Sequence, residues 1–165
     1  PILFEGRTPN LYEYTGNDPV NLIDPSGLLT FHYWEPRPGV KGDYYGHVSI
    51  TLDDGTYISY WPNRKVTRAL ESVPPRPASY YWDRKDQGKD PVNVYVGGLD
   101  EEAIKRWWNR GNQGPWMAAF NNCSDIARDA LEAGGLDLPS EVVNDPSQLY
   151  DALHNSHQRG TRGVQ

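Results

Sequence analysis

The sequence of 165 residues has a single cysteine, no long apolar run and no excess of positive charge. A single cysteine excludes an internal disulfide, so the fold does not depend on an oxidising compartment. No run approaches the roughly 18 apolar residues of a membrane span, and the N-terminus lacks the pattern of a signal peptide. The net charge of −6 disfavours nucleic-acid binding through a broad basic face. We therefore expect no membrane span and no nucleic-acid partner.

Metal-ligand patterns are also missing. No pair of cysteines or histidines has ligand spacing, and His154 and His157, three residues apart, have no evident third ligand. We expect neither a metal nor another cofactor. Aromatic residues are plentiful instead: six Trp and eleven Tyr provide large contact surfaces.

The only cysteine begins a segment with helical periodicity, residues 121–135. Its apolar stripe consists of Cys123, Ile126, Ala127, Ala130 and Leu131. Asn122 fits the N-cap, Asp125 suits the positive end of the helix dipole, and Gly134 and Gly135 provide a stop. The pattern predicts an amphipathic helix with Cys123 at its first position.

Two interpretations fit Cys123 at this position. A free cysteine is often a small buried apolar residue that simply fills a core site. A thiol in the first turn of a helix can instead be a nucleophile, because the dipole and the unpaired amides favour the thiolate. The second interpretation requires a base beside the thiol.

A histidine on a predicted hairpin, residues 44–62, is the base that we expect. Val48, Ile50 and Leu52 alternate with polar residues, and Asp53-Asp54-Gly55 is a turn signal. His47 starts the first strand on the face opposite the aliphatic side chains. A cysteine at a helix N-terminus and a histidine on a strand suit thiolate attack on a carbonyl carbon, with imidazole moving the proton.

The residue that orients His47 stays open. With a two-residue turn, His47 shares its face with Tyr60 and Ile58. With a three-residue loop and a bulge, it shares its face with Tyr57, Ser59 and Trp61, which makes Ser59 a conditional candidate. Asn93, on a third strand over residues 91–96, is the other candidate. For the oxyanion, the expected donors are the amide of Cys123 and the side chain of Asn121 or Asn122, although an N-cap role makes Asn122 less available.

These elements predict an α+β fold with an antiparallel sheet of at least three strands. Helices are expected over residues 100–109, 123–133 and 147–155, packed against the sheet. Residues 73–82 are expected to form a proline-rich surface connection.

The first 28 residues differ in kind, because turn formers dominate them and end in "GNDPVNLIDPSGL". This string closely resembles the end of the Rhs repeat-associated core domain. The resemblance implies a boundary, with residues 1–28 as the end of the Rhs core shell and 29–165 as a toxin domain. It also implies self-cleavage between Leu28 and Leu29, with Asp24 as a motif aspartate. Because the other aspartate motif and the shell are absent, we do not expect this fragment to cut itself.

The second part resembles circularly permuted papain-like hydrolases, which include NlpC-type peptidases and relatives of lecithin–retinol acyltransferase. "GHVSITL", "GTYISYW" and "NNCSDIARDALEAGG" carry this resemblance, in the order histidine then cysteine. It implies a permuted papain-like fold with Cys123 and His47 as catalytic residues. With both residues in this pattern, we favour Cys123 as a nucleophile.

Together the two resemblances imply an interbacterial toxin, a papain-like cysteine protease that cleaves a protein in the recipient cytosol. Secretion, for example by a type VI system, and delivery into a target bacterium are expected. Alternatives are peptidoglycan amide cleavage, phospholipid deacylation or acyl transfer, and a non-enzymatic binding toxin. A cognate immunity protein is expected over the site. Its aromatic anchors are predicted at Tyr44, Tyr45, Tyr60, Trp61 and Trp116.

Overall fold

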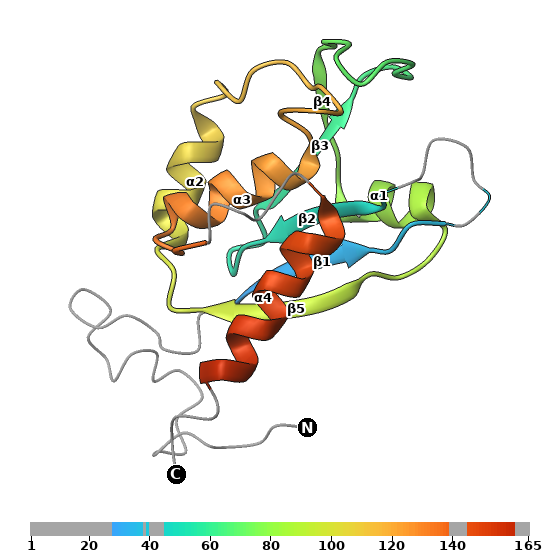
Figure 1. Ribbon diagram of the computed structural model, residues 1–165. Helices are drawn as coiled ribbons and strands as arrows, with labels where there is room; N and C mark the ends of the chain where they lie inside the picture. Colours follow the sequence, from blue (N-terminus) through green and yellow to red (C-terminus); the bar gives the residue numbers. More distant parts are fainter. Residues whose placement is uncertain (1–27, 38, 40–44, 139–144, 161–165) are drawn as a thin grey trace.

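The computed structural model describes residues 28–37, 39, 45–138 and 145–160. Within them the chain is α+β, with one five-stranded antiparallel sheet and four helices (Figure 1). The strands are β1 (Leu28–Trp34), β2 (His47–Thr51), β3 (Tyr57–Pro62), β4 (Pro75–Pro77) and β5 (Val92–Gly97), in the spatial order β4-β3-β2-β1-β5. The helices are α1 (Tyr80–Gln87), α2 (Glu101–Asn109), α3 (Cys123–Ala133) and α4 (Pro146–Gly160). The predicted α+β class is confirmed, as are the helices near residues 100–109, 123–133 and 147–155.

Of the two predicted hairpin turns, the strand register of β2 and β3 matches the three-residue loop over residues 53–55. Ser49 pairs with Ser59 and Ile50 pairs with Ile58. Gly55 has φ +83° and donates its amide to the carbonyl of Leu52, a left-handed conformation that glycine adopts without steric cost. His47 therefore shares its face with Ser59 rather than with Ile58.

The other face of the sheet carries the hydrophobic core. Leu29, Phe31, Val48, Ile50 and Ile58 are all at most 1% exposed and pack beneath α3 and α4. Figure 1 shows α3 and α4 crossing the same side of the sheet, with α2 beside α3. This burial, worth roughly 25 cal/mol per Å² of apolar surface, fixes α3 and hence the position of its first residue.

Residues 73–82 lie mostly at the surface but are more than the expected connection. They contain β4 and the start of α1, and β4 pairs with β3. Ser79 caps α1 by accepting a hydrogen bond from the amide of Trp82, and Gly88 ends the helix at φ +65°. The buried residues of α1 are Asp83 and Gln87, so this helix turns a polar side inward and has no apolar stripe to reveal it.

The strand β1 was also absent from the prediction, because aromatic residues fill its polar positions. His32 and Trp34 alternate with the core residues Phe31 and Tyr33, and all four are buried. Leu28, the first residue of β1, pairs with Gly97 of β5. Asp24 and the rest of residues 1–27 lie outside the described residues. Of the helices that the structure describes, none is long and apolar enough to cross a membrane.

Candidate active site

Cys123 is the first residue of α3, as the sequence predicts. The Asn122 side chain accepts hydrogen bonds from the amides of Ser124 and Asp125, at 2.8 and 3.4 Å. The Asp125 carboxylate accepts one from the amide of Asn122 at 2.9 Å, which completes a capping box. The cap thus engages the amides of Ser124 and Asp125 and leaves out that of Cys123. The thiol is half-buried.

His47 is held in one position from several sides. Its ring is 1% exposed and stacks on the indole of Trp61, with ring centroids 4.3 Å apart. The preceding residue, Gly46, has φ +76°, and a Cβ there would lie 2.1 Å from the carbonyl oxygen of Trp34. Only glycine fits this close approach of β1 and β2, which sets where the strand starts and where the imidazole lies.

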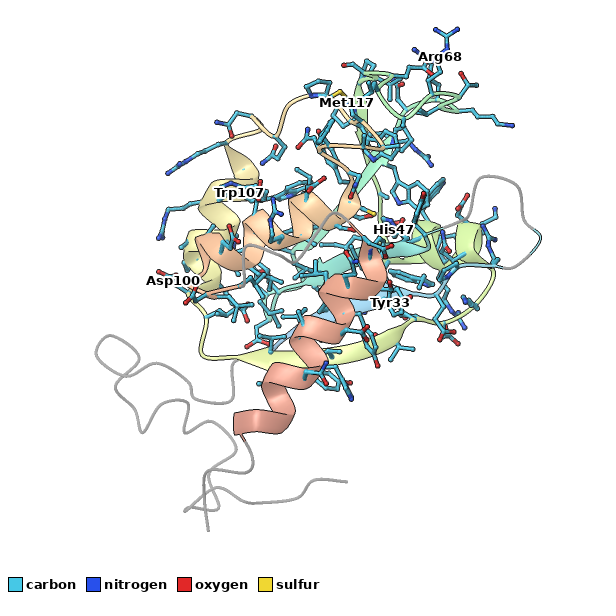
Figure 2. The ribbon with its side chains drawn as sticks, viewed as in Figure 1. Tyr33, His47, Arg68, Asp100, Trp107 and Met117 are labelled. Atoms are coloured by element: carbon cyan, nitrogen blue, oxygen red, sulfur yellow. The ribbon has the colours of Figure 1, made fainter. Side chains whose placement is uncertain are left out.

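The Cys123 thiol lies close enough to the imidazole of His47 to raise the pKa of His47, through its charge and through hydrogen bonding. Figure 2 shows His47 beside the N-terminal end of α3. The Nε2 atom of His47 faces Ser59 at 3.1 Å and Asp83 at 3.2 Å. The base that the nucleophilic interpretation of Cys123 requires is therefore in place.

Asp83 on α1 is the third member of the cluster. Its Oδ2 lies 3.2 Å from His47 Nε2. The hydroxyls of Tyr57 and Ser59 donate to Oδ2 at 2.6 and 2.7 Å, and the indole N–H of Trp61 donates to Oδ1 at 2.8 Å. Asp83 itself is 0% exposed. Four donors around one buried carboxylate stabilise its charged form and fix its orientation toward the imidazole.

The charges within the cluster support one another. Burial alone would lower the pKa of His47, but the charge of Cys123 and the hydrogen bond to Asp83 outweigh it and raise this pKa to about 9. Burial would raise the pKa of Asp83, and the hydrogen bond and charge of His47 reverse this and lower it. The imidazolium is thus the favoured form of His47 at neutral pH, paired with an ionised Asp83.

Ser59, the conditional candidate, lies beside His47, whereas Asn93 does not serve it. The Ser59 hydroxyl is 3.1 Å from His47 Nε2 and donates to Asp83, so it links base and carboxylate. The side-chain oxygen of Asn93 lies 2.7 Å from Nδ1 of another histidine, His32. Asn93 therefore orients His32.

Both side chains predicted to donate to the oxyanion, those of Asn121 and Asn122, make hydrogen bonds elsewhere. Asn122 is committed as the N-cap, and its amide nitrogen donates to the carbonyl of Ala118 at 3.1 Å. Asn121, at φ +70°, donates to the carbonyls of Gln113 and Pro115 at 2.7 and 2.6 Å. Both amides organise the loop before α3. The backbone amide of Cys123 is the predicted donor that the cap leaves unused.

Asp83, the carboxylate that faces the base, does not emerge from the sequence pattern. Asp83 and Gln87 are four residues apart, between the N-cap signal of Ser79 and the stop signal of Gly88. Those two signals could have revealed the helix. Nothing local indicates that its polar side is the buried one, because that depends on the hydroxyls and the indole of β3.

Within the described residues, no group of three or more His, Cys, Asp or Glu side chains is arranged to hold a metal ion. Comparison with known proteins gives the chain no relative: no family model, curated protein or solved structure matches it.

Proposed function

We propose that the chain is a cysteine hydrolase in which Cys123, His47 and Asp83 act together on a carbonyl group. The observation that carries this proposal is the buried His47, which interacts with the only thiol of the chain and is hydrogen-bonded to a four-donor carboxylate. A cysteine that only filled the core would not need a buried ion pair beside it, because desolvating two charges is costly.

In the proposed reaction, the thiol proton resides on His47 and the Cys123 sulfur attacks the carbonyl carbon. A C–S bond forms, and the carbonyl electron pair moves onto oxygen, which the amide of Cys123 stabilises. His47 then donates its proton to the leaving amine or alcohol as the C–N or C–O bond breaks. Water, deprotonated by His47, hydrolyses the thioester and restores the thiol. Asp83 holds the imidazole in place and stabilises its positive charge throughout.

The substrate that we propose first is a protein in the cytosol of a recipient bacterium, cut by a toxin delivered from a competitor. This assignment relies on the Rhs-like string of residues 16–28 and the papain-like motifs around His47 and Cys123. Release from the Rhs shell between Leu28 and Leu29 would start the toxin at a fully buried β1 residue, Leu29.

Expression of residues 29–165 in the bacterial cytosol tests this function. The unaltered chain should arrest growth, and Cys123→Ala and His47→Gln should abolish toxicity at equal protein levels. New protein N-termini found by mass spectrometry only with the unaltered chain would identify the target. Full toxicity of Cys123→Ala would replace the hydrolase with a non-enzymatic binding toxin.

Phospholipid deacylation is the second candidate, because two exposed apolar side chains, Leu70 and Phe120, lie on segments next to the site. The same thioester chemistry cleaves a lipid ester. Fatty-acid release from vesicles by the unaltered chain, absent with Cys123→Ala, would favour it over proteolysis.

A producing cell needs an inhibitor of such a toxin, and we propose an immunity protein that covers Cys123 and His47. Of the predicted anchors, Tyr45 is 66% exposed and suits this contact. Tyr60 is 4% exposed, and its hydroxyl donates to the carbonyl of Gly114, so it belongs to the interior. Trp61 is half-buried against His47, and Tyr44 lies outside the described residues.

A further inference from the structure

Two segments beside the site expose large apolar side chains. Leu70, in the loop between β3 and β4, is 69% exposed, and Phe120, three residues before Cys123, is 58% exposed. The two segments are joined. Val73 and Trp116 exchange backbone hydrogen bonds of 3.0 and 2.8 Å, and the amide of Ala119 donates to the carbonyl of Ala69 at 3.0 Å. Leu70 and Phe120 each adjoin this last bond and therefore lie on one end of the molecule.

The same end is positively charged on an acidic chain. Residues 63–74 contain Arg64, Lys65 and Arg68 against one acid, Glu71, while residues 112–121 carry no charge and the whole chain carries −6. Glu71 is paired with Arg64. Lys65 and Arg68 are exposed and have no acidic partner within the part of the chain that the structure describes. We call Lys65, Arg68, Leu70 and Phe120 the basic–apolar tip.

The shape of this end is a projection. Figure 1 shows the β3–β4 loop extending beyond the helices, and Figure 2 shows Arg68 at its outer end with Met117 on the neighbouring segment. Peptides dock in grooves or along strand edges, where several side chains are enclosed. A projecting pair of apolar side chains flanked by cations instead suits a lipid surface, where the apolar groups enter the interface and the cations meet anionic headgroups.

We propose that the basic–apolar tip docks the protein onto an anionic phospholipid bilayer. Leu70 and Phe120 enter the interface, while Lys65 and Arg68 contact the headgroups. Because Phe120 lies three residues before Cys123, docking holds the thiol close to the membrane surface. This inference goes beyond the proposed hydrolase chemistry and does not depend on it, since binding is measured without turnover.

Vesicle co-sedimentation of the full chain carrying Cys123→Ala tests the proposal. Vesicles of phosphatidylglycerol and phosphatidylethanolamine should sediment the protein at low salt, and vesicles of phosphatidylcholine should not. Replacing Lys65 and Arg68 by alanine should weaken the partition coefficient by roughly 25-fold, because each cation near an anionic surface contributes about fivefold. Leu70→Ser with Phe120→Ser should weaken it by a similar factor or more. The matched control, Lys85→Ala with Arg110→Ala, removes two exposed cations outside the tip and should change it less than twofold.

Two results would overturn the proposal. One is equal sedimentation of the tip variants and the control. The other is no sedimentation with either vesicle, combined with capture of acidic peptides that is lost in Lys65→Ala/Arg68→Ala, which would assign the tip to a protein partner. Circular dichroism of each variant establishes that it is folded. Loss of toxicity in Cys123→Ala has no bearing on these outcomes, so the docking surface and the hydrolase proposal fail separately.

Discussion

Two buried histidines lie on the same face of the sheet and differ in what surrounds them. His47 is 1% exposed and His32 is 5% exposed. The ring nitrogens of His32 lie 2.7 Å from the Asn93 side-chain oxygen and 2.7 Å from the Thr51 hydroxyl, which are neutral groups. Burial lowers the pKa of His32, and the hydrogen bond to Asn93 does not reverse this. His47, beside a carboxylate and a thiol, has its pKa raised to about 9.

Burial alone does not keep a histidine in its charged form. Desolvation acts on both rings and disfavours the charged form. Only the charged partners of His47 overcome it, and they come from α1 and α3, on different elements from the histidine. His32 has a closed, neutral set of hydrogen bonds, as expected for a structural residue. Replacing the hydrogen-bond partners of the two histidines, one at a time, tests how far these partners account for the difference in pKa.

The largest effect is expected when the carboxylate of the His47 cluster is neutralised. Asp83→Asn leaves His47 with a neutral partner, as Asn93 does for His32, and an amide cannot stabilise the imidazolium. Activity should fall by roughly ten-thousandfold, as when the aspartate of a Ser-His-Asp triad is neutralised. The pKa of His47, followed by NMR titration, should fall below its value of about 9. An unchanged titration would show that Asp83 does not act on the imidazole.

The raised pKa of His47 also makes stability depend on pH. The folded state holds the His47 proton up to about pH 9, whereas the unfolded chain releases it near pH 6.5. This stabilisation is therefore fully present below pH 6.5 and is lost as the pH rises through about 9. It amounts to about 3 kcal/mol, taking 1.36 kcal/mol per pKa unit. Urea unfolding at pH 6 and pH 9.5 should show the loss in the unaltered protein. His47→Gln should remove most of it, and a pH-independent free energy of unfolding would contradict this linkage.

Removing a single donor from the carboxylate should have a smaller effect. Tyr57→Phe deletes the 2.6 Å hydrogen bond to Asp83 and leaves three donors in place. Hydrogen bonds to charged groups contribute about 1.5–3 kcal/mol, so the free energy of unfolding should fall by about 2 kcal/mol and activity should fall by about tenfold. Tyr95→Phe is the matched control, because Tyr95 is on the same sheet face and 55% exposed. Equal behaviour of the two variants would exclude Tyr57 from the cluster.

The smallest effect on activity is expected when His32 is given a carboxylate partner, as His47 has in Asp83. Asn93→Asp places a carboxylate 2.7 Å from the His32 ring nitrogen and should raise the pKa of His32 above its lowered native value. Hydrolysis should stay within about twofold of the unaltered rate. A large loss of activity would return Asn93 to the role of orienting His47 that the sequence leaves open for it.

The sequence predicts the parts of the site that a local pattern encodes. The stripe of α3, its cap and the hairpin alternation place Cys123 and His47, and the hydroxyl of Ser59 follows from the loop length. Asp83 does not follow, because α1 buries polar residues and its role depends on groups of β3. The strand β1 was missed for a related reason: on its polar face, His32 and Trp34 are buried, so the alternation of a half-exposed strand is hidden.

The most direct test of the account is the reactivity of Cys123, the only cysteine of the chain, because one thiol gives one unambiguous label. Chloroacetamide alkylation at pH 7 can be followed by intact-protein mass spectrometry for the native chain and for the urea-unfolded chain. As a control for urea itself, the native chain is also alkylated at a urea concentration below the one that unfolds it. Native Cys123 should react faster than the unfolded chain, and His47→Gln and Asp83→Asn should reduce this advantage in the folded state. If native Cys123 reacts no faster than the unfolded chain, and the two variants match the unaltered protein, the cluster does not activate its thiol and the hydrolase account is wrong.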